Sequence, residues 1–398
     1  MEQAYIVSAV RTPVGSFGGY FKDVGAPALG SHAIRAALER ARVAHEDVDE
    51  VVLGCVLQAG LGQNPARQAA LGAGLPDEVP ATTINMLCGS GLKSVTLASQ
   101  MIRAGDADIV LAGGMENMSR APYLVPTNRF GAGMGDVQMI DSMTHDGLVD
   151  AFEHVHMGIT AENVAEEYGI SREDQDAFAA QSQQKAERAI DAGIFKEEIV
   201  PIEIPQKRGE PRVIDNDEHP RPGSTAEALA KLRAAFRKDG GTVTAGNASG
   251  LNDGAAAILV MSERQVRERG LTPLGLVESY ASVGVPPRIM GIGPIPATRK
   301  ALAKAGLHVA DIDLFELNEA FAAQSLAVCR ELDLPMDRVN PHGGAIALGH
   351  PIGASGGRIL VTLLHEMRRG QLERGVAALC VGGGQGQAAV IRRMNGSF

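Results

Sequence analysis

A unit of one helix, one strand and a glycine turn occurs twice in this sequence. In the first copy, a helix expected over residues 91–103 precedes an apolar strand at 108–112, and Gly113 and Gly114 follow. In the second copy, a helix expected over 356–369 precedes a strand at 377–381 and a further glycine run. The copies are 266 residues apart at the helix start and 270 apart at the glycines, so one four-residue loop insertion reconciles them. The repeat predicts a duplicated α/β fold.

The rest of the chain continues the alternation of short apolar runs and amphipathic helical patterns, which is typical of layered βα units. Further strands are expected at 5–10, 50–54, 255–261, 274–279 and 312–317. Further helices are expected at 30–42, 171–192, 226–238, 297–304 and 319–332. Ser171 is the expected N-cap of its helix, with Asp174 three residues later.

Length and charge narrow the class of protein. A chain of 398 residues suits two or three domains, and 45% hydrophobic with 21% charged residues predicts a globular protein. A net charge of −10 argues against general binding to nucleic acid or to an anionic membrane. No apolar run reaches the ~20 residues of a transmembrane helix, and a strand pattern begins almost at Met1. We therefore expect a cytoplasmic enzyme without a leader peptide.

The cysteines and histidines do not suggest a disulfide framework or a metal site. Four cysteines in so long a chain indicate a reducing compartment, and no CxxC pair is present. His154 and His156 are close in sequence but lack a convincing set of further ligands, so we expect no metal.

Two of the cysteines stand next to glycines at the end of an apolar run. Cys88 lies in Asn85-Met86-Leu87-Cys88-Gly89-Ser90-Gly91, before a helix whose free N–H groups and positive end favour a thiolate. Cys380 precedes Gly382-Gly383-Gly384, whose bare N–H groups suit an oxyanion or a close ligand. Cys88 is a candidate nucleophile and Cys380 a candidate site residue, and for each the alternative is a small core residue.

His350 lies in a stretch with six glycines in fifteen residues, from Gly343 to Gly357. Pro351 disfavours helical backbone at the residue before it, so His350 belongs to a shaped loop ahead of a helix. That setting favours a general base over the structural role that a lone histidine usually has. Asn318 follows an apolar strand at the start of a predicted helix, and a role as N-cap explains it adequately.

Residues 119–248 separate the two halves and differ from them in composition. The run Phe130-Gly131-Ala132-Gly133-Met134-Gly135 has no clear strand before it and no helix directly after it, so we interpret it as a flexible or interface loop. From 206 to 238 basic residues outnumber acidic ones by three, which indicates either a site for a small phosphorylated ligand or a solvated helix face. The basic residues are Lys207, Arg208, Arg212, Arg221, Lys231, Arg233, Arg237 and Lys238.

Taken together, the motifs resemble the thiolase family, and within it the biosynthetic acetyl-CoA acetyltransferase type. The resemblance runs almost from end to end of the chain. In order, the motifs are Asn85-Met86-Leu87-Cys88-Gly89-Ser90-Gly91, Gly113-Gly114-Met115-Glu116-Asn117-Met118-Ser119, Asn247-Ala248-Ser249-Gly250-Leu251-Asn252-Asp253-Gly254, Asn318-Glu319-Ala320-Phe321, Gly349-His350-Pro351 and Cys380-Val381-Gly382-Gly383-Gly384.

The resemblance implies two βα-repeat halves in a five-layered αβαβα core, with an inserted loop domain. The expected N-terminal half comprises residues 1–118 and 249–270, the loop domain 119–248, and the C-terminal half 271–398. In this family the loop that corresponds to residues 126–143 joins dimers into tetramers, so the resemblance implies a homotetramer built from two tight dimers.

The resemblance also implies a role for each catalytic residue. Cys88 would take an acetyl group from acetyl-CoA as a thioester after His350 deprotonates it. Cys380 would remove the α-proton of a second acetyl-CoA, whose carbanion attacks the thioester to give acetoacetyl-CoA. His350 and, through a held water, Asn318 would stabilise the enolate-like oxygen, and the N–H groups of Cys88 and Gly382 would form a second oxyanion hole. The resemblance implies no cofactor besides the CoA thioesters.

CoA would lie on the loop domain. Ala228 stands where some relatives place a polar contact to adenine. The positions that match the family's CoA-binding residues are Leu148, His156, Met157, Arg221, Ala235, Phe236, Ala245, Ser249, Met290 and Phe321.

Three alternatives share parts of this pattern. A degradative 3-ketoacyl-CoA thiolase of broader chain length has the same catalytic residues, and the run His156-Met157-Gly158 favours the short-chain type instead. A ketoacyl synthase is disfavoured by Cys380 with its glycine run. A non-catalytic lipid-binding relative would be expected to lack Cys88, His350 or Cys380, and all three are present.

Overall fold

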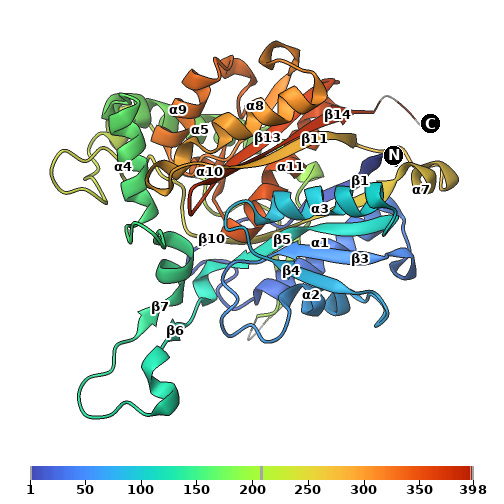
Figure 1. Cartoon of the computed structure of the whole chain (residues 1–398), viewed down its shortest axis with the longest axis horizontal. Coiled ribbons are helices and arrows are strands. Elements are labelled where there is room, and N and C mark those ends of the chain that lie inside the picture. The colour runs from blue at the N-terminus through green and yellow to red at the C-terminus, as the bar shows by residue number, and fades with distance from the viewer. Residues whose placement is uncertain (1, 207–208, 395, 397–398) are drawn as a thin grey trace.

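The computed structural model of the protein describes residues 2–206, 209–394 and 396, and its main element is a ten-stranded mixed sheet (Figure 1). The strands of this sheet are β1 (Ala4–Arg11), β2 (Gly15–Ser16), β3 (Glu50–Gly54), β4 (Ala81–Ile84), β5 (Ile109–Asn117), β10 (Asn252–Ser262), β11 (Gly275–Gly284), β12 (Leu314–Leu317), β13 (Arg374–Val381) and β14 (Gln385–Arg393). Their order is β12-β13-β14-β11-β1-β10-β5-β3-β4, and β2 pairs with β10. Two small sheets pair β6 (Tyr123–Leu124) with β7 (Ile140–Asp141) and β8 (Ile202–Ile204) with β9 (Arg212–Ile214).

The N-terminal strand joins two arms of this sheet. β1 pairs with β10 along its length but with β11 only at Tyr5 and Ile6. One arm is therefore β4-β3-β5-β10-β1 and the other is β11-β14-β13-β12. Within them β3 runs parallel to β4 and β5, and β12 runs parallel to β13.

Helices cover both faces of each arm. The α-helices of the described ranges are α1 (Ala26–Ala41), α2 (Pro65–Ala73), α3 (Ser90–Ala104), α4 (Met157–Glu167), α5 (Arg172–Asp191), α6 (Ala226–Leu229), α7 (Glu263–Glu268), α8 (Pro294–Ala305), α9 (Ala322–Glu331), α10 (Ala345–Leu348) and α11 (Ile352–Arg369). Of these, α4, α5 and α6 pack mainly on other helices instead of on the sheet. Within the described ranges, no helix is long and apolar enough to cross a membrane.

The alternation of side chains along the strands separates three apolar layers. In β10, Leu259 packs with α1 and α2, whereas Ile258 packs with α3 and α11. In β13, Leu379 packs with the same middle helices, whereas Ala378 packs with α8 and α9. Because neighbouring strand residues point to opposite faces, each arm is buried on both sides. The predicted five-layered αβαβα core is confirmed, with α3 and α11 as its middle layer.

The helix predicted at 226–238 is wrong beyond its first turn, because α6 ends at Leu229. The guanidinium of Arg172 donates hydrogen bonds of 2.9 Å to the carbonyl oxygens of Leu229 and Leu232. The N–H of Ala235 bonds to the carbonyl of Val243 instead of to a helical partner. The backbone groups that a continued helix would need are therefore hydrogen-bonded to Arg172 and to Val243 instead.

The other differences concern elements that the sequence pattern hides. The predictions omit β4, β14, α2, α4, α7, α10 and the short strands β2 and β6 to β9. They also start α1 and α11 four residues late each, and for α11 the N-cap is Pro351. The predicted N-cap of α5 is confirmed, since the hydroxyl of Ser171 accepts a 3.0 Å hydrogen bond from the N–H of Asp174.

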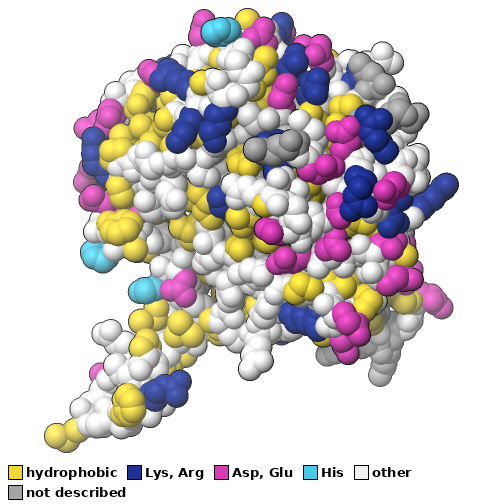
Figure 2. Space-filling view, turned by 45° about the vertical axis from the view of Figure 1, so that its right-hand side comes forward, with side chains coloured by type: hydrophobic (Ala, Val, Ile, Leu, Met, Phe, Trp, Pro, Cys, Tyr) yellow, Lys and Arg dark blue, Asp and Glu magenta, His cyan; other side chains and the backbone are white. Residues whose placement is uncertain are grey.

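A long loop projects from the body of the molecule between β6 and β7 (Figures 1 and 2). It contains the glycine- and methionine-rich run singled out in the sequence, and the side chains of Phe130 and Met134 at its end are fully exposed. These apolar side chains have no core to pack against within the chain.

The middle layer depends on close contact between two helix backbones. A Cβ atom on Gly356 would lie 2.3 Å from the backbone nitrogen of Leu92, and one on Gly91 would lie 2.6 Å from that of Gly357. These distances leave no space for a methyl group between α3 and α11. Glycine is therefore required at this crossing for steric reasons.

We expect Gly356→Ala to lower the free energy of unfolding by about 1–3 kcal/mol, because the added methyl group must push the two helices apart. Urea denaturation followed by circular dichroism measures the loss. Gly25→Ala is the matched control, since Gly25 has φ −62° and the nearest atom to its Cβ position is 3.8 Å away. Equal unfolding midpoints for the two variants would contradict the steric argument.

Candidate active site

A pocket of about 420 Å³ collects side chains from distant parts of the chain. Cys88 and His350 both line it. It is also lined by every position that the sequence matched to CoA binding: Leu148, His156, Met157, Arg221, Ala235, Phe236, Ala245, Ser249, Met290 and Phe321. The structure therefore brings the candidate nucleophile, the candidate base and these ten residues to one place.

Cys88 stands on a strained turn before α3. Leu87, the residue before it, has φ +46°, a left-handed conformation that is unfavourable for a leucine. The hydroxyl of Ser90 fixes the turn, because it accepts from the N–H of Met86 at 2.8 Å and donates to the carbonyl of Leu87 at 2.7 Å. The thiol is thereby presented to the pocket from the end of the helix.

Backbone N–H groups at this turn favour the thiolate of Cys88, but burial of the thiol outweighs them. Burial raises the pKa of this thiol to about 11, and the nearby carboxyl of Glu116 acts in the same direction. The backbone N–H groups of Gly382 and of Cys88 itself act on the sulfur in the opposite direction but do not outweigh burial. Cys88 is therefore a neutral thiol at neutral pH and needs a base.

Cys380 lies one residue before the end of β13 and is fully buried, in an apolar cluster with Met157 and Phe321. Burial raises the pKa of its thiol, and the proximity of Cys88 raises it further. The two sulfurs are thus near enough to influence each other's ionisation. The turn that follows holds Gly383 and Gly384 at φ +74° and +79°, a conformation that favours glycine.

His350 is held in the loop between α10 and α11, as its following proline predicts. Its backbone N–H donates a 2.8 Å hydrogen bond to Oδ1 of Asn252, whose own amide donates to the carbonyl of Gly15 at 3.0 Å. Burial and the charge of Arg358 lower the pKa of the imidazole to about 3. The ring is therefore neutral at neutral pH and able to accept a proton.

The hydrogen bonds around this ring identify its tautomer. The hydroxyl of Ser355 lies 2.8 Å from the carbonyl oxygen of Pro351 and 2.5 Å from Nδ1 of His350. A hydroxyl has one proton, and a carbonyl can only accept, so Ser355 donates to Pro351 and accepts from Nδ1–H. The lone pair is then on Nε2, which is the atom that can act as the base.

Asn318 is not the helix cap that its sequence position allowed. The cap of α9 is Phe321, and the amide nitrogen of Asn318 lies 3.3 Å from Nε2 of His350. The same nitrogen lies 3.5 Å from Nδ1, so this contact does not distinguish the two ring nitrogens. The amide oxygen of Asn318 is buried and has no hydrogen-bond partner among the described residues, so it remains available as an acceptor.

Aromatic rings form one wall of the pocket. The rings of His156 and Phe236 stack with centroids 4.7 Å apart, and Phe321 meets Phe236 edge-on at 6.4 Å. Gly158 makes this stack possible, because a Cβ there would lie 2.2 Å from the ring of Phe236. This wall is apolar and rigid.

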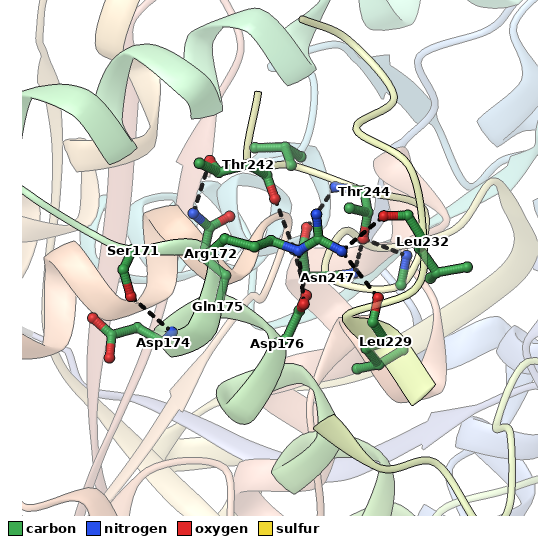
Figure 3. Close-up of polar contacts among 12 residues, drawn as sticks. Ser171, Arg172, Asp174, Gln175, Asp176, Leu229, Leu232, Thr242, Thr244 and Asn247 are labelled. Carbon is green, nitrogen blue, oxygen red and sulfur yellow. Dashed lines mark hydrogen bonds and ion pairs between the residues drawn. The ribbon is translucent and has the colours of Figure 1, made fainter. Parts of the chain in front are cut away.

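The irregular segment that carries Phe236 is anchored by polar contacts from α5 (Figure 3). Arg172 holds two of its carbonyl oxygens and pairs with Asp176 at 2.7 Å. Asp176 in turn accepts from the amide of Asn247 at 2.9 Å. From α4, the buried carboxylate of Glu162 accepts from the N–H groups of Thr242 and Val243 at 2.9 Å. These bonds replace regular secondary structure.

The basic stretch does not form one surface. Of its described members, Arg221 lines the pocket, Arg212 lies over the ring of Tyr20, and Arg237 pairs with Glu166 at 3.1 Å. Lys207 and Arg208 lie outside the described residues.

Comparison with known proteins places this arrangement in a family. Residues 4–264 match the family model "Thiolase, N-terminal domain", and residues 271–393 match "Thiolase, C-terminal domain". The chain belongs to the thiolase family.

The thiolase is similar over nearly its whole length to several known proteins. It is 60% identical over 393 residues to an acetyl-CoA acetyltransferase of Pseudomonas aeruginosa, which covers 99% of this chain and 100% of the relative. It is 58% identical, with the same coverage, to an acetyl-CoA acetyltransferase of Cupriavidus necator and to a probable acetyl-CoA acyltransferase of Staphylococcus aureus. The crystal structure of a Bacillus anthracis acetyl-CoA acetyltransferase superposes with a TM-score of 0.97 at 47% identity and 99% coverage of both chains.

The residues that orient Cys88 and His350 in this thiolase were not predicted from the sequence. Ser355 and Asn252 hold His350, and Ser90 fixes the turn of Cys88. The spacing of Ser355, four residues after Pro351 on the same helix, is the one signal that could have been read in advance.

We expect Ser355→Ala to lower kcat about 10–100-fold with little change in KM, because Nδ1–H loses its acceptor and the ring loses its fixed tautomer. Steady-state rates of acetoacetyl-CoA thiolysis measure both constants. Ser99→Ala is the control, since the buried hydroxyl of Ser99 on α3 has no hydrogen-bond partner among the described residues. An unchanged kcat in a folded Ser355→Ala enzyme would refute the tautomer assignment.

Proposed function

We propose that this thiolase is an acetyl-CoA C-acetyltransferase, which joins two acetyl-CoA molecules to acetoacetyl-CoA and CoA and also catalyses the reverse thiolysis. Two relatives that share 58–60% of its sequence carry the name acetyl-CoA acetyltransferase. The observation that carries the proposal is a thiol and a neutral imidazole that line one apolar pocket, with the second thiol, that of Cys380, buried against the lining residues Met157 and Phe321. Transfer through a thioester needs a nucleophile and a base, and removal of an α-proton needs a second base.

In the first half-reaction, Nε2 of His350 takes the proton of the Cys88 thiol. The thiolate attacks the carbonyl carbon of acetyl-CoA, a C–S bond forms, and the bond to CoA breaks. CoA leaves as a thiolate and accepts the proton of Cys380. An acetyl thioester on Cys88, an imidazolium and a Cys380 thiolate remain, so charge is conserved.

In the second half-reaction, the Cys380 thiolate takes an α-proton from a second acetyl-CoA. Burial raises the pKa of this thiol, which makes its thiolate a stronger base toward a weakly acidic C–H group. The carbanion attacks the acetyl carbon, and the bond to Cys88 breaks. The Cys88 thiolate then recovers its proton from His350.

Two sets of donors stabilise the oxyanions in this mechanism. The N–H groups of Cys88 and Gly382, which already act on the sulfur, form one of them. The imidazolium of His350 and a water held by Asn318 form the other. The reaction needs no chemical group besides CoA thioesters.

CoA binds along the pocket on residues of the 119–248 loop domain, with the two halves 1–118 plus 249–270 and 271–398 supplying the catalytic residues. Phe236 and Met157 offer apolar surface to the pantetheine chain, and Arg221 contacts the nucleotide end. The exposed side chains of Phe130 and Met134 on the projecting loop are covered when the protein assembles into a homotetramer of two tight dimers.

We expect the two cysteines to fail in different half-reactions. Cys88→Ala should form no acetyl-enzyme, because the nucleophile is absent. Cys380→Ala should still be acetylated on Cys88, but its condensation rate should fall about 10²–10⁴-fold, because no positioned base takes the α-proton. Mass spectrometry of the intact proteins after brief exposure to acetyl-CoA reads the label directly.

Cys329→Ala is the control for this experiment, since Cys329 on α9 is buried in the apolar cluster formed by α8, α9 and β13 and does not line the pocket of Cys88. It should be labelled and active. A label on Cys380 in the unmodified enzyme, or no label on Cys380→Ala after long incubation, would reverse the assigned roles.

We expect a preference for short acyl chains, because the buried side chains of Met157, Met290 and Phe321 close the pocket. Acetoacetyl-CoA should be cleaved at least tenfold better than 3-ketooctanoyl-CoA in kcat/KM, a difference of about 1.4 kcal/mol. Met290→Ala should reduce this ratio by opening the wall. Equal kcat/KM values for the two substrates in the unmodified enzyme would indicate the degradative 3-ketoacyl-CoA thiolase.

A further inference from the structure

A second cavity, of about 340 Å³, lies at the other end of α11 from His350. It is bounded by residues 7–9 of β1, the last turn of α1 and the last turns of α11. With a rise of 1.5 Å per residue, His365 in this cavity is about 20 Å along the helix from Ile352 in the pocket of Cys88. The cavity is therefore separate from the proposed catalytic pocket.

The cavity exists because β1 lacks a partner strand along part of one edge. On the N-terminal side of this unpaired part, the carbonyl of Ile6 accepts from the N–H of Leu274 at 2.7 Å. On its C-terminal side, the N–H of Arg11 donates to the carbonyl of Glu198 at 3.0 Å. Between these two pairings β1 carries a bulge at Ile6–Ser8, and bulges re-aim side chains.

Two buried polar atoms in this cavity have no hydrogen-bond partner among the described residues. They are Oγ of Ser8 and Nδ1 of His365, whose residues are 4% and 7% exposed. The carboxylate of Glu197 faces Nδ1, but its Oε2 lies 3.9 Å away, beyond hydrogen-bond distance. Nε2 of His365 lies 3.0 Å from the carbonyl oxygen of Ala9 and must donate to it. Burial lowers the pKa of His365, so the ring is neutral and its Nδ1 carries a lone pair. The cavity thus offers one hydroxyl and one acceptor nitrogen.

The charge of the lining is positive overall. Arg40 and Arg368 both border the cavity, against the single carboxylate of Glu197. The guanidinium of Arg40 is fixed by the carbonyl oxygens of Glu197 and Ile199. Arg368 forms no ion pair with any residue in the described part of the chain, so its charge is available to a ligand.

We propose that this cavity binds a small oxyanion that also carries a hydroxyl group, of the class of hydrogen phosphate. Its charged oxygens accept from the hydroxyl of Ser8 and from the guanidinium of Arg368. Its own hydroxyl donates to Nδ1 of His365. A ligand of this kind satisfies both unpartnered atoms, which an anion without a hydroxyl cannot do.

Calorimetric titration of inorganic phosphate into the full-length enzyme tests the proposal, with CoA present at saturation so that the pocket of Cys88 is occupied. We expect one phosphate bound per chain. Arg368→Gln and Ser8→Ala should each weaken binding at least tenfold. Arg369→Gln is the matched control, since Arg369 is the next residue but pairs with Glu366 instead of lining the cavity, and its affinity should be unchanged.

Sulfate tests the role of the ligand's hydroxyl group separately from that of its charge, because at neutral pH sulfate has the shape of phosphate but no proton to donate. We expect sulfate to bind at least tenfold more weakly than phosphate. Crystals soaked in arsenate, which keeps the hydroxyl, should show the anomalous arsenic peak between Ser8 and His365. Absence of saturable binding, equal affinity for sulfate, equal affinity in Arg368→Gln, or an arsenic peak elsewhere only would each overturn the proposal.

Discussion

The contact between the backbones of α3 and α11 is the constraint on which the active site depends. The two helices belong to the two copies of the sequence repeat, and each begins at a catalytic loop. Because glycines let them touch without side chains between them, their N-terminal ends meet at the same edge of the core. The loops of Cys88 and His350 can therefore line one pocket. A further close approach, of Gly114 to the carbonyl of Gly353, fixes β5 against the first turn of α11.

Burial, more than any helix dipole, sets the charge of Cys88 and His350, which line this pocket, and of Cys380, which is buried beside it. The pKa values of both thiols are raised, and that of the imidazole is lowered, so all three are neutral before substrate arrives. In the proposed mechanism, charge separation then occurs only once a thioester is present to be attacked. Such a resting state protects the thiols of Cys88 and Cys380 from oxidation, which proceeds through the thiolate.

The apolar periodicity predicted most strands of the main sheet, because it is a local property of the sequence, whereas the five layers followed from the resemblance to the thiolase family. The sequence could not predict where α6 ends, because the carbonyl oxygen of its last residue is bonded by Arg172, more than fifty residues away along the chain. The charge of Cys88 could not be predicted either, because a helix terminus can be recognised in the local sequence whereas burial depends on the whole fold. The roles of Ser355 and Asn252 could not be predicted for the same reason, because each residue acts through a contact with His350 that only the tertiary structure defines.

The central position of β1 has a consequence for how the protein is made. β1 is the first strand to be synthesised, yet Ala256, the nearest residue of β10 that pairs with it, comes 245 positions after Arg11. At about 5–20 residues per second, a nascent chain waits about 12–50 s before this strand can find a partner. During that time an apolar strand is exposed beside the ribosome. Folding of the core is therefore completed only late in synthesis, and the N-terminal half depends on protection from aggregation until then.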